Sequence, residues 1–227
     1  MDSNAFIILT ARNEADRLGA TMRALVEAFP GTPIWVGDDG SSDETSQVAC
    51  EAGATVVRSE RPIGKGAAAT LTARRALERL RPPGDAIAVL CDGDLGACAG
   101  QLVELLVPLE RDEADLAVAA FARRLGGGLG FAVGFARWAI RRRCGLLLQA
   151  PISGQRALRV RALEDVLPFA GGFGMEMGMT IDAARAGNRI SEVALDLEHR
   201  ATGRTLSGFA HRGRQLVDFV CVYLERR

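Results

Sequence analysis

Two carboxylates stand one residue apart in the segment Asp92-Gly93-Asp94, which directly follows the apolar run 86–91. The glycine between them lets the backbone bend both carboxylates toward one point. Oxygen ligands of this kind suit Mg²⁺ or Mn²⁺, which usually complete their coordination shell with phosphate oxygens and water. We therefore predict a divalent metal ion at Asp92 and Asp94. The alternative interpretation of these three residues alone is an ordinary surface turn.

A second acidic turn, Asp38-Asp39 followed by Gly40 and Ser41, comes after another apolar run. A carboxylate at Asp39 can accept hydrogen bonds from the N–H of a nucleotide base or from ribose hydroxyls, or it can cap the helix that follows. Lys65 lies between two glycines, where its ammonium group can approach a diphosphate closely. The segment lacks the spacing of a P-loop, so a nucleoside triphosphatase is disfavoured.

The elements that must position these residues alternate along residues 1–100. Short, continuously apolar runs predict strands at 5–10, 34–37, 55–57 and 86–91, and amphipathic helical patterns separate them. This alternation predicts an α/β fold in a single domain, with a mostly parallel sheet and helices on both faces. Ligands bind outside the carboxyl ends of the strands in such sheets, and both acidic turns fall there.

The second half of the chain is less regular. The patterns predict a strand at 116–121, helices at 138–148, 175–186 and 208–224, and a final strand at 189–197. Glu176 follows a glycine-rich turn at the start of a helix, where the helix dipole stabilises a carboxylate. That position suits a group that holds a sugar hydroxyl, acts as a general base on an acceptor, or caps the helix.

In chain order, the segments 7–14, 38–43, 64–66 and 92–95 resemble the motifs of GT-A fold glycosyltransferases of the family 2 type. The resemblance implies a Rossmann-like domain in which residues 1–100 bind the nucleotide sugar and residues 101–227 bind the acceptor. It implies a nucleotide pocket built from Ala11, Asn13, Glu14, Asp39 and Lys65. It also implies that Asp92 faces ribose or metal and that Asp94 is a catalytic carboxylate on the metal.

The segments 151–156, 167–169, 172–178 and 199–200 resemble the glucosyl-3-phosphoglycerate and mannosyl-3-phosphoglycerate synthases. This resemblance implies that His199 completes the metal shell, and a neutral imidazole beside two carboxylates is a reasonable ligand set on chemical grounds. If the reaction inverts the anomeric carbon, Glu176 is the candidate general base. If it retains the configuration, as those synthases do, Glu176 positions the donor sugar or the acceptor.

One segment departs from those synthases, which carry Arg and Thr directly after a glycine-rich loop that binds the acceptor phosphate. Here the glycines at 126–128 are followed by Leu129, Gly130 and Phe131. The segment 131–148 then combines aromatic and aliphatic residues with arginines, which suits an anionic membrane surface and a lipid-linked acceptor such as a polyprenyl phosphate. The alternative is a helix that packs its apolar face on the core and leaves its arginines in solvent.

The overall composition excludes some classes of partner. Lys plus Arg and Asp plus Glu each number 28, so no basic field favours nucleic acid. The five cysteines are odd in number and form no CxxC pair, which argues against a disulfide framework and a zinc site. With no recognisable signal peptide or spanning segment, we expect a cytoplasmic protein, or one held at the inner face of the membrane. The oligomeric state stays open, with a homodimer as one option.

The function expected from these features is metal-dependent transfer of a hexose from a nucleoside diphosphate sugar, UDP-glucose or GDP-mannose. The acceptor is a phosphorylated small molecule or a polyprenyl phosphate. A nucleotidyltransferase is the first alternative, but it would require a glycine-rich loop after the first strand, and residues 10–13 contain no glycine. The second alternative is a catalytically silent nucleotide-sugar-binding module.

Overall fold

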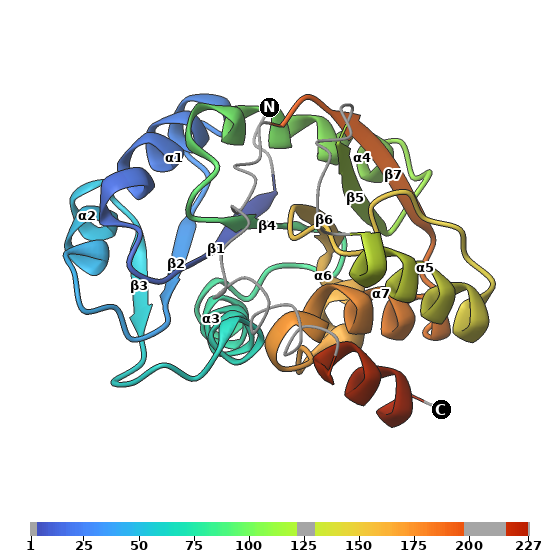
Figure 1. Cartoon of the computed structure of the whole chain (residues 1–227). Coiled ribbons are helices and arrows are strands. Elements are labelled where there is room, and N and C mark those ends of the chain that lie inside the picture. Colours follow the sequence, from blue (N-terminus) through green and yellow to red (C-terminus); the bar gives the residue numbers. More distant parts are fainter. Residues whose placement is uncertain (1–3, 122–129, 198–216, 227) are drawn as a thin grey trace.

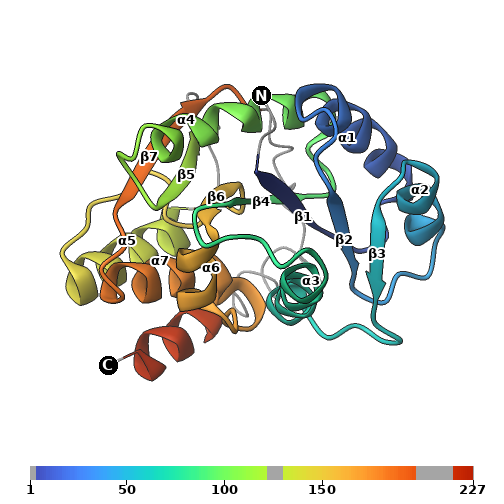
Figure 2. The same cartoon turned by 180° about the vertical axis from the view of Figure 1, so that it is seen from behind.

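The computed structural model describes residues 4–121, 130–197 and 217–226. Seven strands form one sheet in the order β3-β2-β1-β4-β6-β5-β7 (Figure 1). The strands are β1 Ala5–Ala11, β2 Ile34–Asp38, β3 Thr55–Arg58, β4 Ile87–Asp92, β5 Leu116–Phe121, β6 Arg156–Arg159 and β7 Ile190–Leu195. Helices lie on both sides of this sheet, as the view from behind also shows (Figure 2). The predicted α/β fold is therefore confirmed.

Strand direction decides which residues meet at each edge of the sheet. The neighbours within β1 to β4, and the pair β5 and β7, are parallel, whereas β6 runs antiparallel to both β4 and β5. The carboxyl ends of the parallel strands therefore share one edge with the amino end of β6. The register places Thr10 opposite Asp92 and Ala11 opposite Asp38, so the two acidic turns lie at this edge.

Alternating residues of the central strands face two apolar layers. On one face, Ile7 and Leu9 pack with α1 (Ala15–Ala28), α2 (Thr45–Glu51), the 3-10 helix η1 (Gly96–Leu106) and α4 (Val107–Glu110). On the other face, Phe6 and Ile8 pack with α3 (Lys65–Leu80), α6 (Val160–Val166) and α7 (Met175–Arg185). Burying each such side chain contributes about 1.5–3 kcal/mol. Both layers hold the strand ends at fixed positions.

A third apolar cluster joins α7 to two further helices. It contains Ala136 and Ile140 from α5 (Gly130–Cys144), Ile181 from α7, and Phe219 from a C-terminal helix at 217–225. These side chains are wholly buried. Because α7 contributes to this cluster and also packs on the sheet, it joins α5 and the C-terminal helix to the rest of the fold.

Several elements differ from the sequence-based prediction. The patterns did not predict η1 and α4 at 96–110, or β6 and α6 at 156–166. Strand β6 has four residues, too few to show a period-two pattern. The predicted helix at 138–148 was wrong at both ends, since α5 begins at Gly130 and stops before Gly145, whose φ of 74° suits a helix end. Of the helix predicted at 208–224, only the part from residue 217 falls within the described residues.

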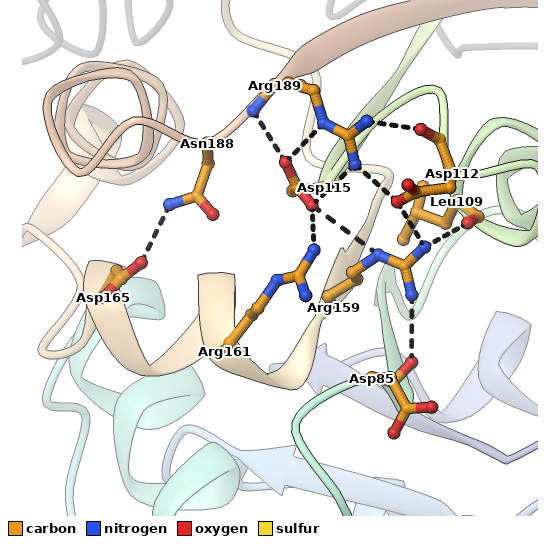
Figure 3. A network of polar contacts seen from close by, with 9 residues as sticks. All are labelled: Asp85, Leu109, Asp112, Asp115, Arg159, Arg161, Asp165, Asn188 and Arg189. Atoms are coloured by element: carbon orange, nitrogen blue, oxygen red, sulfur yellow. Dashed lines mark hydrogen bonds and ion pairs between the residues drawn. The ribbon is translucent and has the colours of Figure 1, made fainter.

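A network of charged residues joins the starts of β5 and β7 at the opposite edge of the sheet (Figure 3). Asp115 accepts hydrogen bonds from Arg189 Nε at 3.0 Å and from Arg161 Nη2 at 2.5 Å. Asp112 accepts from Arg189 Nη2 at 2.6 Å and from Arg159 Nη2 at 3.3 Å. The hydrogen bonds from Arg189 in particular hold the pKa of Asp115 well below its usual range.

Candidate active site

The edge of the sheet with the acidic turns is organised by short backbone contacts. Asp39 N donates to Ala11 O at 3.0 Å and Gly93 N donates to Thr10 O at 3.0 Å, so both turns continue the ladder of β1. The wholly buried Thr21 of α1 donates its hydroxyl to Gly93 O at 2.7 Å. The turn after β4 is therefore fixed from two sides before any ligand binds.

Lys65 joins the two halves of the site. Its Nζ lies 2.8 Å from Asp92 Oδ1 and 2.8 Å from Glu176 Oε1. Burial lowers the pKa of Lys65, but the charges of Asp92 and Glu176 outweigh that effect and raise the pKa above its ordinary value. The ammonium group is therefore charged at physiological pH. The predicted nucleotide-binding lysine and the predicted sugar-side carboxylate thus come together across the sheet edge.

Close backbone packing brings Lys65 and Glu176 together. Lys65 is the first residue of α3, after Gly64, which has a φ of 91°. A Cβ on Gly66 would lie 2.0 Å from Ala170 O, so only glycine allows the start of α3 to approach the segment before α7 this closely. Thr70 Oγ1 also accepts a hydrogen bond from Phe169 N at 3.0 Å. Glu176 stands in the first turn of α7, as predicted, and its side chain is 9% exposed.

The two predicted metal-binding carboxylates have different surroundings. Asp92 Oδ2 accepts a hydrogen bond from Gln155 Nε2 at 2.9 Å, in addition to the contact of Oδ1 with Lys65. The Asp94 side chain is 36% exposed, and Arg17 Nη1 lies 4.0 Å from its Oδ2. Asp94 is therefore the more accessible of the two carboxylates.

Glu14 lies in the same electrostatic environment as Asp94. Burial and the negative charge of Asp94 raise the pKa of Glu14, and Arg17, whose Nη1 lies 3.7 Å from Glu14 Oε2, offsets part of that rise. A cation bound near Asp94 would relieve the same repulsion. Arg17 was not predicted as a site residue. In the protein without a ligand, its positive charge offsets part of the repulsion between Glu14 and Asp94.

The described residues fit a divalent metal ion through their chemistry, not through a complete ligand cluster. Asp92 and Asp94 supply the oxygen donors that Mg²⁺ and Mn²⁺ prefer. No group of three or more His, Cys, Asp and Glu suited to hold a metal occurs within residues 4–121, 130–197 and 217–226. The third predicted ligand, His199, lies outside these ranges. The two carboxylates leave coordination positions for diphosphate oxygens.

The turn after β2 is built largely around its own carboxylates. Asp38 is fully buried and accepts a hydrogen bond from Ser41 N at 2.8 Å. Asp39 accepts from Ile63 N at 2.6 Å and from Gly64 N at 3.1 Å, so it fixes the loop that leads into α3. The Asp39 carboxylate therefore already holds the loop that leads to Lys65. If it also binds a nucleotide, as predicted, the same carboxylate serves both contacts.

Asn13 is held against the same turn. Its φ of 52° is a left-handed conformation that asparagine tolerates better than most residues. Asn13 N donates to Ser41 Oγ at 3.0 Å, and Asn13 Oδ1 accepts from Ser42 N at 2.8 Å. Asn13, Asp39 and the buried Ala11 thus lie in one connected structure where β1 and β2 end. Three of the residues predicted for the nucleotide pocket therefore lie together, and their contact with a nucleotide stays a prediction.

Two residues that contact Asp92 were not predicted as site residues. Gln155 is fully buried beside it, and a Cβ on Gly154 would lie 2.7 Å from Asp92 Oδ2 and 2.9 Å from Lys65 Nζ. A small pocket next to these groups is lined by Lys65, Asp92, Gly154 and Met175, among others. The sequence contained both residues within the segment 151–156, but nothing in it showed that this segment returns to the end of β4.

The fold and the site define the class of the protein as a GT-A glycosyltransferase. Within that class the chain belongs to glycosyl transferase family 2, whose family model matches residues 6–167. This confirms the family resemblance and the enzyme class expected from the motifs.

Several known proteins similar to this chain are described as glucosyl-3-phosphoglycerate synthases. The glucosyl-3-phosphoglycerate synthase of Mycolicibacterium paratuberculosis is 33% identical, over 93% of this chain and 69% of the relative. Two crystal structures of the Mycobacterium tuberculosis glucosyl-3-phosphoglycerate synthase are each 27% identical, over 99% of this chain and 80% of theirs. One, with Mn²⁺, UDP and glucosyl-3-phosphoglycerate, has a TM-score of 0.78, and another, with Mn²⁺, UDP-glucose and phosphoglyceric acid, has a TM-score of 0.77.

Proposed function

We propose that this chain transfers glucose from UDP-glucose to a phosphorylated small molecule of the phosphoglycerate type, in the presence of Mn²⁺ or Mg²⁺. The observation that carries the proposal is the contact of Lys65 with both Asp92 and Glu176, because it joins a diphosphate-binding cation to carboxylates of the metal side and of the sugar side. The donors and acceptors of the similar synthases support the choice of substrates. GDP-mannose remains the second candidate donor.

The site residues have separate tasks in this reaction. Asp94, Asp92 and, by resemblance, His199 would hold the metal ion, which supplies positive charge to the leaving diphosphate. Lys65 is charged and can turn from its carboxylate partners toward a diphosphate oxygen. Asn13, Glu14 and Asp39, with the backbone at Ala11, would bind the nucleoside. These tasks need no rearrangement of the sheet.

Glu176 is the residue whose role depends on stereochemistry. If the configuration at the anomeric carbon is retained, Glu176 orients a hydroxyl of the donor sugar or of the acceptor. If it is inverted, Glu176 is the general base that takes the proton of the acceptor hydroxyl. An NMR assignment of the product's anomeric configuration decides between the two.

A ligand panel followed by a transfer assay tests the proposed function. Unfolding midpoints are measured with UDP, GDP, UDP-glucose and GDP-mannose, each with and without Mn²⁺, because a ligand that binds only the native state raises the midpoint. Transfer from the best donor to 3-phosphoglycerate is then followed by mass spectrometry. We expect the largest midpoint rise with UDP-glucose and Mn²⁺, and a product of glucose joined to phosphoglycerate. Metal-dependent donor binding without transfer to any phosphorylated acceptor would contradict the proposal and favour the silent binding module.

The proposal extends to a peripheral membrane contact through the segment 131–148, with a cytoplasmic location. No helix in the described parts of the chain is long and apolar enough to cross a bilayer. Most of the apolar face of α5 packs into the third cluster, but Trp138 is 51% exposed and Leu147 is 73% exposed, and Arg141 and Arg142 are exposed between them. These four side chains are the surface available to anionic lipid.

Co-sedimentation with liposomes tests the membrane contact. The variant Arg141→Ser/Arg142→Ser removes two exposed charges and leaves Arg143, which donates to Tyr223 O at 2.8 Å and stacks over the Tyr223 ring. We expect less binding to vesicles with phosphatidylserine and no change with neutral vesicles. Equal binding of the wild type and the variant to the anionic vesicles would contradict the membrane contact. The phosphorylated small molecule would then be the favoured acceptor. The homodimer also stays a prediction, to be tested by light scattering after size-exclusion chromatography.

A further inference from the structure

Gln155 lies where the antiparallel strand β6 begins, at the edge of the sheet that carries the active site. Its side chain is wholly buried, its Nε2 donates to Asp92 Oδ2 at 2.9 Å, and its Oε1 accepts from Ser153 Oγ at 3.3 Å. Its backbone oxygen accepts from Ala119 N at 3.0 Å in β5. The side-chain amide is therefore held by two hydrogen bonds, and the backbone of Gln155 is held by a third.

Arg156 anchors the same segment to the helix that carries Glu176. The guanidinium group is wholly buried and donates to Ser153 O at 2.8 Å, to Pro151 O at 3.2 Å and to Thr180 Oγ1 at 2.9 Å. Thr180 in turn donates to Glu176 O at 3.0 Å. Burial lowers the pKa of Arg156 to about 10, against the opposing charges of Glu176 and Glu192.

These contacts connect the segments that hold the two carboxylates in contact with Lys65, those of Asp92 and Glu176. On one side Gln155 fixes Asp92, and on the other Arg156 fixes the first turns of α7 through Thr180. Gly154 lies between them, so close to Asp92 and Lys65 that any side chain would displace one of the two. Each guanidinium nitrogen of the buried Arg156 donates one hydrogen bond, so the loss of a partner would leave a buried polar group unpaired and cost stability.

We propose that Gln155 is a positioning residue that sets the orientation of the Asp92 carboxylate for the metal ion and the donor diphosphate, with Gly154 and Arg156 as its support. This inference rests on the proposed function, because it assigns Asp92 to the metal side of the donor site. A carboxylate oxygen has two lone pairs, so Asp92 Oδ2 can accept from Gln155 and still bind a cation. A neutral amide orients the carboxylate without neutralising the charge that the metal ion needs.

The test separates orientation of Asp92 from general stability. In Gln155→Leu the side chain keeps its approximate volume and loses the donor, whereas Ser153→Ala removes only the bond to Gln155 Oε1 and serves as the matched control. UDP affinity is measured by calorimetry with and without Mn²⁺, together with the unfolding midpoint. We expect Gln155→Leu to weaken Mn²⁺-dependent UDP binding roughly 10- to 100-fold, as for other residues that orient metal ligands, with metal-free binding unchanged. Ser153→Ala should match the wild type.

A second variant keeps the proposal testable if Gln155→Leu does not fold. Gly154→Ala leaves Gln155 in place and puts a Cβ 2.7 Å from Asp92 Oδ2 and 2.9 Å from Lys65 Nζ, so it should weaken Mn²⁺-dependent UDP binding more than metal-free binding. Equal loss of metal-free and metal-dependent binding, or wild-type binding in both variants, would overturn the assignment. The proposed reaction can fail separately, since a wild type that binds UDP with Mn²⁺ but transfers no glucose still allows this test. A wild type without Mn²⁺-dependent UDP binding overturns both.

Discussion

Lys65 places one positive charge between two carboxylates that lie far apart in the sequence. Without a donor, Asp92 and Glu176 share this charge. In the proposed reaction, the oxygens of a bound diphosphate would compete for the same ammonium group, and a metal ion near Asp92 would replace the positive charge that Asp92 loses. The ammonium group of Lys65 is already paired with two carboxylates, so a donor that replaces these partners would add little desolvation cost. The free-energy cost of donor binding would therefore stay low.

Replacing Lys65 tests this exchange. Lys65→Met keeps the aliphatic stem but leaves Asp92 and Glu176 facing each other, so we expect UDP binding to weaken by about 1.5–3 kcal/mol, roughly a factor of 10 to 100. Lys65→Arg is the matched control, since it keeps the charge and changes its geometry. Calorimetric titration with UDP in the absence of metal measures the effect. An equal loss of UDP affinity in Lys65→Met and Lys65→Arg would mean that the shape of the side chain, and not its charge, determines UDP binding.

Asp94 is the accessible carboxylate of the predicted metal pair. In Asp94→Ala we expect the Mn²⁺-dependent part of the UDP-induced rise in unfolding midpoint to disappear. At a UDP concentration 100 times Kd, the whole stabilisation by UDP is about 2.7 kcal/mol in the wild type, and the Mn²⁺-dependent part is its difference from the metal-free value. Asp16→Ala removes an exposed carboxylate close in space to Arg17 and outside the turn, and it is the control for net charge. If the response to Mn²⁺ survives in Asp94→Ala, the metal assignment fails.

At the scale of the elements, the site depends on how closely α3 approaches the segment before α7. Gly66 contacts the backbone at Ala170, and this approach sets where Lys65 can reach. The ion pair with Glu176 spans 111 residues of sequence, so it is a product of packing and not of any local pattern. Small residues at such contacts are part of the active site although they carry no functional group.

A glycine-to-alanine pair tests this packing. Gly66→Ala forces its Cβ against Ala170 O, and we expect a loss of about 1–3 kcal/mol in unfolding free energy as the two segments separate. The kcat should also fall, because Lys65 moves away from Glu176. Gly134→Ala in α5 meets no atom within 4 Å and should raise stability by about 0.5–1 kcal/mol. Urea unfolding of both variants measures the difference, and effects of the same sign would contradict the packing argument.

At the scale of the whole molecule, the sequence was informative where chemistry and local structure coincide. The runs before Asp39 and Asp92 predicted strands, and parallel pairing then required their turns to share an edge. Gln155 could not be predicted in this way, because its position depends on the reversed direction of a strand with four residues. The predicted end of α5 was wrong because the apolar residues 146–148 continue past Cys144, whereas the backbone turns at Gly145. His199 remains a prediction from resemblance.

The charged network at the far edge ties β5, β6 and β7 together, and its effect on stability should depend on pH (Figure 3). The pKa of Asp115 is lower in the folded protein than in the unfolded chain, where an aspartate titrates near 3.9. Below that value the unfolded state binds more protons than the native state, so stability falls as the pH falls. The contribution of Asp115 is therefore complete above about pH 4 to 5 and decreases progressively toward stronger acid.

Asp115→Asn isolates this contribution, since it keeps the shape and removes the charge from a side chain that is 7% exposed. We expect a loss of about 1–3 kcal/mol in unfolding free energy at pH 7, because Arg161 and Arg189 are 54% and 46% exposed, and a smaller difference from the wild type at pH 3. Asp85→Asn is the control, because Asp85 enters the network through its backbone oxygen, which accepts from Arg159 Nη1 at 3.5 Å. Urea unfolding at both pH values provides the measurement. A gap between Asp115→Asn and the wild type that stays constant from pH 7 to pH 3 would show that hydrogen-bond geometry, and not the charge of Asp115, joins these strands.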